Sequence, residues 1–381
     1  MPIIMKISYI TTYDASDLKN WSGLGYYIAN SMINQNAEID FIGNLTAKAD
    51  YSLRLKSFYY KTLGKKFAFD REPYIVNQFA QKASALLNPN TDIIFSPGSI
   101  PIALLESHKP KVFYTDATFA GMLGFYKEFS NFCSETIKHG NYLEQKALDS
   151  SELVIYSSDW AAKTAIENYN INPNKIKIVP FGANLESNRN LDSIKELVSK
   201  RSKKVCNLLF LGVDWERKGG DLAIEVAKKL NTEGLETKLH LLGIPKEITQ
   251  TFPSFVINHG FISKSTADGK EKINNIISEC HFLILPTKAE AFGLALCEAN
   301  SFGIPCLATN IGGIPTIIKD NINGKLFSLT DSINDYVDYI LTLFYDSNKY
   351  QELSFSSFNE YESRLNWEVS GKSIMNILKQ L

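Results

Sequence analysis

The chain has 381 residues, of which 44% are hydrophobic and 21% charged, and its formal net charge is −1. This length exceeds what one hydrophobic core usually supports, so we expect a soluble globular protein of two domains. A net charge near zero excludes a global field that would favour nucleic acid or an anionic membrane. The five cysteines are scattered and form no Cys-x-x-Cys pair, which favours reduced thiols in a reducing compartment and argues against structural zinc.

The first half of the chain alternates short apolar runs with helical patterns. We expect strands at KISYITTY, AEIDFIGN, DIIFSPG, KVFYTDA, LVIYSS and KIKIVPFG, and helices at 26–34, 136–148 and 161–169. Apolar strands that alternate with helices indicate a parallel sheet covered on both faces. The N-terminal run has no basic leader and no small-residue cleavage site, so we interpret it as the first strand, and we expect a cytoplasmic protein.

The second half repeats this architecture without repeating the sequence. Strands are expected at NLLFLG, KLHLLG, SFVINHG, HFLILP and IPCLATN, and helices at 221–230 and 294–302. Residues 184–205 carry several charges and no strand pattern, so we expect the chain to cross between domains there. After GKLFSL the chain turns helical to its end. These patterns predict an N-terminal domain at 1–184, a C-terminal domain at 185–366 and a final helix at 367–381.

An acidic pair follows one strand of the second half. HFLILP ends at the carboxyl edge of a sheet, where open α/β domains usually bind ligands, so Glu290 falls in the next loop and Glu298 in the next helix. Each carboxylate can accept hydrogen bonds from a vicinal diol, a glycine at 293 lets the backbone approach a ligand, and a helix N-terminus suits phosphate. A nucleotide sugar satisfies all three features. Either glutamate alone is more simply interpreted as a solvated surface residue, but the pair in this setting favours a ligand.

Two cations follow another strand of the same half. In LFLGVDWERKGG a strand ends at Gly212, and Arg217 and Lys218 precede two glycines and a helix. Cations beside glycine-rich backbone can neutralise a diphosphate leaving group. The alternative is a pair of exposed charges, which the helix macrodipole disfavours at that end.

Together with VPFGANL and IGGIPTIIKDNINGKLF, these segments resemble the retaining family-4 glycosyltransferases of the GT-B fold, most strongly over residues 153–330. The resemblance implies two Rossmann-like domains with parallel sheets facing across a cleft. The N-terminal domain would bind the acceptor, the C-terminal domain the nucleotide sugar, and the last helix would cross back to the N-terminal domain. Trp367, Ile374, Ile377 and Leu378 recur near helical spacing and provide a face for that contact.

The resemblance also implies roles for individual residues. Glu290 would contact hydroxyls of the donor sugar, Glu298 the ribose, and Lys218 the diphosphate. The implied reaction is sugar transfer with retained anomeric configuration, by front-face attack in which the departing phosphate takes the acceptor's proton. Backbone amides around three residues would meet sugar and phosphate: Phe292, Gly293 and Leu294.

The chain departs from the family pattern at two positions. Where many members carry an arginine after the strand-ending glycine, Val213 and Asp214 stand here, and Arg217 is the candidate replacement. Where many members carry a histidine near the donor sugar, FYTDATFAG offers Asp116, for which an ordinary helix-capping role is an equal alternative.

A glycine pair in the first half, Gly23 and Gly25 of NWSGLGYYIAN, resembles the loop that lies over the donor phosphates in this family. The Rossmann fingerprint would need a third glycine where Ile28 stands, which disfavours an NAD-dependent dehydrogenase.

We expect no metal and no cofactor, with a UDP- or GDP-linked sugar as substrate. The acidic DWE segment lies beside two cations that would compete with a metal ion, and the five histidines show no ligand spacing. The acceptor would be a glycan, a lipid-linked molecule or a small molecule. Two alternatives are a non-transferring enzyme of the same fold, such as an epimerase, and a nucleotide-sugar-binding protein without turnover.

A basic and aromatic stretch, residues 51–71, suits a membrane interface and would make the protein peripheral at the inner face of the membrane. The alternative is a solvated surface loop with its aromatic residues packed inward.

Overall fold

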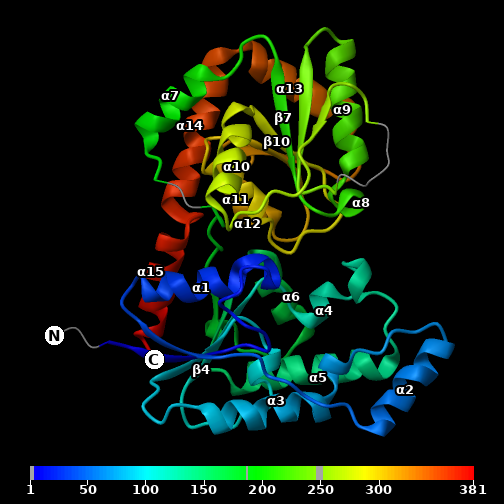
Figure 1. The fold of residues 1–381 in the computed structure, drawn as a ribbon, viewed down its shortest axis with the longest axis vertical. Coiled ribbons are helices and arrows are strands. Elements are labelled where there is room, and N and C mark those ends of the chain that lie inside the picture. The colour runs from blue at the N-terminus through cyan, green and yellow to red at the C-terminus, as the bar shows by residue number, and fades with distance from the viewer. Residues whose placement is uncertain (1–3, 186–187, 246–251) are drawn as a thin grey trace. The chain divides into compact units, whose positions relative to one another are not determined.

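The computed structural model of the chain describes residues 4–185, 188–245 and 252–381 (Figure 1). The chain divides into two compact units, one made of Met1–Pro180 with Trp367–Leu381 and the other of Phe181–Asn366. Each unit contains a six-stranded sheet in which all neighbouring strands run parallel. The predicted α/β class with two parallel sheets is confirmed.

The first sheet has the strand order β2-β1-β3-β4-β5-β6, so the order reverses between β1 and β3. Successive residues of a strand point to opposite faces. Ile10 and Phe113 therefore belong to the core beneath α3 and α5, while the buried Tyr9 and Tyr114 occupy the other face. The strands are β1 (Lys6–Ile10), β2 (Glu38–Ile42), β3 (Ile93–Ser96), β4 (Lys111–Thr115), β5 (Leu153–Tyr156) and β6 (Ile176–Ile178). The helices are α1 (Leu24–Ile33), α2 (Tyr51–Thr62), α3 (Pro73–Leu86), α4 (Phe119–Met122), α5 (Ser134–Ser150), α6 (Asp159–Asn168) and α15 (Trp367–Leu378).

The C-terminal helix α15 packs on α1 of the first unit (Figure 1). The rings of Trp367 and Tyr27 stack with centroids 6.0 Å apart. Gly371 allows the two helices to approach closely, because a Cβ there would lie 2.3 Å from the carbonyl oxygen of Ser31. The buried residues of α15 are Ser370, Gly371, Ile374, Met375 and Leu378.

The second sheet has the order β12-β11-β10-β7-β8-β9, and its order reverses between β7 and β10. This is the strand order of the dinucleotide-binding Rossmann sheet. The strands are β7 (Cys206–Leu211), β8 (Thr237–Leu242), β9 (Val256–Asn258), β10 (Phe282–Leu285), β11 (Cys306–Thr309) and β12 (Gly324–Phe327). The helices are α7 (Leu191–Lys200), α8 (Trp215–Lys218), α9 (Gly220–Thr232), α10 (Ala267–Glu279), α11 (Leu294–Asn300), α12 (Ile314–Ile317), α13 (Ile333–Tyr345) and α14 (Ser347–Arg364).

The interpretation of residues 184–205 as a crossing segment is wrong for most of that stretch. It contains α7, which begins at a capping box formed by Asn190 and Ser193 and packs against α14. Ile194 and Val198 are the buried residues of α7, one turn apart on the same face. The segment is therefore part of the second unit.

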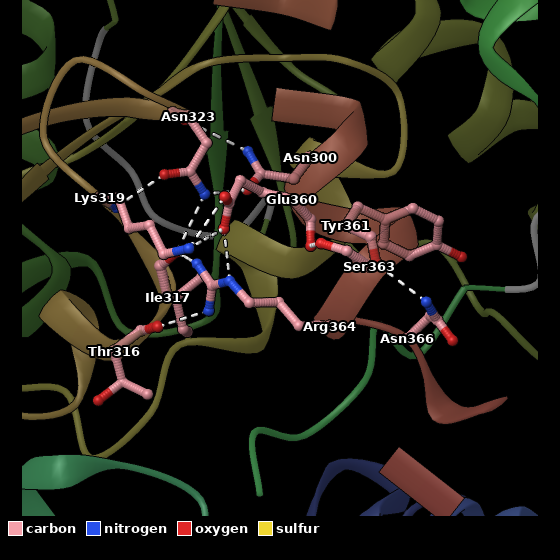
Figure 2. Close-up of polar contacts among 10 residues, drawn as sticks. All are labelled: Asn300, Thr316, Ile317, Lys319, Asn323, Glu360, Tyr361, Ser363, Arg364 and Asn366. Atoms are coloured by element: carbon pink, nitrogen blue, oxygen red, sulfur yellow. Dashed lines mark hydrogen bonds and ion pairs between the residues drawn. The ribbon is translucent and has the colours of Figure 1, made fainter. Parts of the chain in front are cut away.

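Polar contacts fix the end of α14 to the segment around α12 (Figure 2). The guanidinium of Arg364 donates to the carbonyl oxygens of Thr316 and Ile317, both at 2.6 Å. One turn earlier, Glu360 pairs with Lys319 at 3.0 Å. These contacts satisfy carbonyl groups at the end of α12 that the helix itself leaves unpaired. Among the residues that the structure describes, no helix combines the length and hydropathy that crossing a membrane requires.

Candidate active site

The predicted site residues of the second unit meet where the strand order reverses. β7 and β10 are neighbours in the sheet, and α8 with Arg217 and Lys218 follows β7, while the loop with Glu290 follows β10. Open α/β sheets bind ligands at the carboxyl ends of the strands at such a reversal. The topology therefore brings together two sequence segments that lie some seventy residues apart.

The carboxylate of Glu290 pairs with both cations. Lys218 Nζ lies 3.1 Å and Arg217 Nη1 3.3 Å from Glu290 Oε2. The side chains of Glu290, Lys218 and Arg217 are 12%, 11% and 21% exposed. The interpretation of these residues as solvated surface charges is therefore wrong. They form a largely buried cluster in which each charge-assisted hydrogen bond offsets part of the desolvation.

The turn after β7 is fastened to the loop after β10. The backbone amide of Lys288 and the hydroxyl of Thr287 both donate to the carbonyl oxygen of Arg217, at 2.8 and 3.0 Å. Gly219 adopts a φ of +77°, and a Cβ there would lie 2.2 Å from the carbonyl oxygen of Pro286. Glycine is required at this position both by backbone conformation and by space. These contacts join the two loops that carry the charged cluster.

Arg217 and Lys218 are held in different ways. Arg217 donates to the carbonyl oxygen of Ala289 at 2.6 Å and to Asp214 Oδ2 at 3.2 Å, and Asp214 also caps α8 by accepting the amide of Arg217. Lys218 lies over Gly212, where a Cβ would come within 2.2 Å of the lysine Cδ. The glycine that ends β7 thus makes room for the lysine side chain, while Arg217 organises the loops.

Glu298 is buried within α11 and has a cationic partner that the sequence did not reveal. Its exposed fraction is 2%, so the exposed-helix interpretation is wrong. Lys264, from the segment between β9 and α10, donates to Glu298 Oε1 and is 38% exposed along its side chain. The ion pair therefore has a buried carboxylate and a partly exposed ammonium group.

The end of α11 is fixed by a buried amide pair (Figure 2). Asn323 donates to Asn300 Oδ1 at 2.7 Å and accepts the backbone amide of Lys319 at 2.7 Å. Both asparagines are fully buried. Because Asn300 is the last residue of α11, this pair fixes the helix two residues beyond Glu298.

The three residues whose amides were expected at the ligand lie between the glutamates. Gly293 caps α11 with a φ of +106°, which favours glycine. Phe292 is 2% exposed and packs edge-on against Phe181 with ring centroids 5.0 Å apart, and Leu294 begins the helix. The amide of Gly313 donates to the carbonyl oxygen of Glu290 at 3.0 Å, which fixes the preceding loop.

The first unit carries Gly23 and Gly25 at the start of α1, which follows β1, and Asp116 directly after β4. Gly23 caps α1 with a φ of +81°, and Gly25 is buried inside α1, where a Cβ would lie 2.8 Å from the hydroxyl of Tyr13. Burial is the main cause that raises the pKa of Tyr13, and the negative charge of Asp116 raises it further. The Tyr13 hydroxyl has no hydrogen-bond partner among the described residues. The helix after β4 is capped by Thr118, so the capping role considered for Asp116 is wrong.

One group of side chains in the first unit is close enough to hold a cation. Ligand atoms of Glu72, Glu135 and His139 lie within 4.8 Å of one another. His139 Nδ1 contacts Glu72 Oε1 at 3.1 Å, and Lys56 pairs with Glu135. The sequence interpretation overlooked this group, although Glu135 and His139 are four residues apart on α5, a spacing that places two side chains on one helix face.

Comparisons with known proteins find relatives that are described as glycosyltransferases. Residues 192–357 match the family model of the group 1 glycosyl transferases. A Klebsiella pneumoniae protein described as an uncharacterised 41.2 kDa protein in the cps region is 26% identical over 60% of this chain and 60% of its own length. An Escherichia coli UDP-Gal:α-D-GlcNAc-diphosphoundecaprenol α-1,3-galactosyltransferase is 24% identical over 45% of this chain and 46% of its own. The chain thus spans about half the length of the curated relatives it matches.

The whole chain is also similar to solved structures. Anabaena HepE in complex with UDP-glucose superposes with a TM-score of 0.63 at 16% sequence identity, covering 99% of this chain and 100% of HepE. The likeness confirms the predicted GT-B fold of two Rossmann-like domains.

Proposed function

We propose that this chain is a glycosyltransferase that transfers a sugar from a nucleotide diphosphate sugar to an acceptor, with retention of the anomeric configuration. The observation that carries the proposal is the buried cluster of Glu290, Lys218 and Arg217 at the reversal of strand order between β7 and β10. The family match over 192–357 includes this cluster. With Asp214, which pairs with Arg217, the cluster holds two carboxylates and two cations, and a buried cluster of this kind at a ligand-binding edge is more than the fold needs for stability.

Lys218 suits the diphosphate of the donor. An ammonium group has three N–H donors, and Lys218 uses one of them, on Glu290, within the described part of the chain. Its remaining donors are free to bind phosphate oxygens and to stabilise the negative charge of the leaving group. The guanidinium of Arg217 already donates to the loop after β10. Its positive charge beside Lys218 would also favour the negatively charged leaving group.

Glu290 suits the sugar and Glu298 the ribose. Glu290 Oε2 accepts from both cations, whereas Oε1 accepts no hydrogen bond from any described residue and can accept one from a sugar hydroxyl. Among the residues that the structure describes, Lys264 is the one that donates to the Glu298 carboxylate. On this assignment Gly293 lets the backbone approach the donor between the two glutamates.

The proposed mechanism relies on positioning and charge. The acceptor hydroxyl attacks the anomeric carbon on the face from which the diphosphate departs, and the departing phosphate takes its proton. The glutamate carboxylate near the sugar would stabilise an oxocarbenium-like state, and the neighbouring cations would stabilise the phosphate. We propose that Lys218 and Arg217 supply the charge without a metal ion, that the donor is UDP- or GDP-linked, and that Asp116 and the Gly23–Gly25 segment contribute from the first unit.

The acceptor is proposed to be a glycan or a lipid-linked glycan. The Escherichia coli relative acts, by its name, on a sugar carried by diphosphoundecaprenol, and its similarity covers 45% of this chain.

A panel of nucleotide sugars tests the proposal. UDP-, GDP-, ADP- and TDP-linked sugars should be compared by thermal unfolding, because a ligand that binds only the native state raises its stability. We expect a shift with at least one donor, slow release of nucleotide without acceptor, and a product with the donor's anomeric configuration. Lys218→Gln should weaken donor binding about ten-fold or more, whereas Lys228→Gln, an exposed residue of α9, should not. No shift with any donor would refute the proposal, and an epimerised sugar or binding without turnover would assign the site to another activity.

A further inference from the structure

Helix α2 exposes an apolar stripe that no other part of the described chain covers. Tyr51, Leu55, Phe58 and Tyr59 are 75%, 52%, 66% and 59% exposed, and Leu63, just beyond the helix, is 55% exposed. Residues of an α-helix are about 100° apart, so these four helical positions lie within an arc of about 100°. Scattered exposed apolar residues are ordinary in soluble proteins, but a contiguous stripe marks an interaction surface.

The surface loop of the alternative interpretation is wrong for residues 51–62, which form α2, but other aromatic residues of the stretch do pack inward. Tyr60 stacks on Phe67 at 5.9 Å, Phe67 meets Phe69 edge-on at 5.3 Å, and Leu53 is buried. The stretch is thus a helix with two apolar faces, and only one of them belongs to the core.

Basic residues flank the exposed stripe. Tyr51–Thr62 contains no acidic residue. Arg54 and Lys61 are exposed, lie together along one edge of the stripe by helical geometry, and form no ion pair with any described residue. Lys65 and Lys66 follow the helix and are also exposed. Figure 1 shows α2 at the periphery of the first unit, away from the sheet.

A hollow beside α2 adds apolar surface next to a cation. It has a volume of about 360 Å³, and Arg54 of α2 and Asp70 belong to its wall. The other side chains are mainly apolar and include Leu45, Phe69, Ile75 and Phe79. Arg54 therefore belongs both to the basic edge of α2 and to the wall of this mainly apolar hollow.

We propose that α2 docks the protein on the surface of an anionic lipid bilayer, with Tyr51, Leu55, Phe58 and Tyr59 inserted among the headgroups and Arg54 and Lys61 against lipid phosphates. An apolar face with basic flanks is the pattern of helices that lie in a membrane interface. A second copy of the chain fits this surface less well, because a two-fold contact would bring Arg54 and Lys61 of one copy near the same cations of the other. The proposal does not rest on the cluster of Glu290, Lys218 and Arg217, which belongs to the second unit.

Vesicle sedimentation with the full chain tests the proposal. Vesicles of phosphatidylcholine alone should bind the protein weakly, and vesicles that also contain phosphatidylglycerol should bind it well, with binding that falls as salt rises. Arg54→Gln with Lys61→Gln should lower binding to anionic vesicles by about five-fold per cation, so about 25-fold for the pair. Leu55→Gln with Phe58→Gln should lower it ten-fold or more.

Matched controls separate the stripe from general surface properties. Leu86→Gln with Ile166→Gln removes exposed apolar side chains from other helices, and Lys109→Gln with Lys163→Gln removes exposed charges. Both control pairs should bind vesicles as the unaltered protein does, and circular dichroism should be the same for all variants. Equal binding to neutral and anionic vesicles, no binding to either, or full binding by the Leu55 and Phe58 variant would overturn the proposal. Self-association that depends on the same two residues would assign the stripe to a second copy instead.

Discussion

If Glu290 contacts the sugar and Glu298 the ribose, as proposed, exchanging each for glutamine should affect different kinetic constants. Glu290→Gln keeps the side-chain volume and one oxygen acceptor but removes the charge that Lys218 and Arg217 share. The sugar changes charge and shape in the transition state, so a contact to it can strengthen there. One hydrogen bond to a charged group is worth about 1.5–3 kcal/mol, which corresponds to a loss of about ten- to 150-fold in kcat.

Glu298→Gln should act on binding instead. The ribose stays far from the breaking bond, so its contact contributes nearly equally to the ground and transition states. We expect a higher KM for the donor and a smaller change in kcat. The partner left behind, Lys264, is 38% exposed and can be hydrated, so the stability of the protein should change little.

Steady-state kinetics with varied donor concentration, together with thermal unfolding, measures both effects. The loss of stability for Glu290→Gln should stay below the about 3–5 kcal/mol of a broken buried ion pair, because the amide oxygen can still accept from Lys218. Wild-type kinetics in both variants would contradict the proposed donor contacts and would leave the two glutamates with structural roles only. A lower kcat for Glu298→Gln than for Glu290→Gln would reverse the assignment of sugar and ribose.

Three further predictions concern the scaffold. Gly219→Ala should lower the free energy of unfolding by more than about 1 kcal/mol, the cost of a strained left-handed backbone, because the added Cβ would also clash with the carbonyl oxygen of Pro286. Gly234→Ala is the control, because Gly234 has a φ of +92° and open space around it, so the substitution should cost only the backbone strain there. Burial raises the pKa of Glu144 from its ordinary 4.5 to about 7, so between these pH values the folded state binds more protons than the unfolded state. The free energy of unfolding should therefore fall by about 3 kcal/mol as pH rises from 4.5 to 7. Glu144→Gln should remove this pH dependence in denaturant titrations. Deletion of 367–381 should cost solubility or activity, since it uncovers the face of α1 on which α15 packs, and a fully active and equally stable truncation would contradict this.

Local pattern predicted most of the secondary structure. HFLILP forms the fully buried strand β10, and the helix expected at 294–302 is observed as Leu294–Asn300. Helix α7 also has a sequence signal, because its buried residues Ile194 and Val198 recur at helical spacing between charged residues. Pattern alone also placed Glu290 in a loop and Glu298 in a helix, because a strand end followed by glycine leaves few other arrangements.

The sequence pattern did not predict which side chains form contacts across long distances in the chain. Nothing local to Glu298 indicates that Lys264 meets it, since the contact depends on how β9 and β10 are placed in the sheet. The outward face of α2 is a related case. An apolar stripe at helical spacing predicts a covered face, and only the three-dimensional structure shows whether another element covers it.

The pairing of Glu290 with Lys218 and Arg217 has a consequence for the proposed reaction. Without donor these charges satisfy one another, and Glu298 is likewise satisfied by Lys264, so the site carries no large excess of either sign. A diphosphate must therefore share Lys218 with Glu290, which weakens ground-state binding of the donor. As the glycosidic bond breaks, positive charge grows on the sugar beside the carboxylate and negative charge grows on the phosphate beside the ammonium. The same ion pair then stabilises both developing charges at once, so its contribution is larger in the transition state than in the ground state.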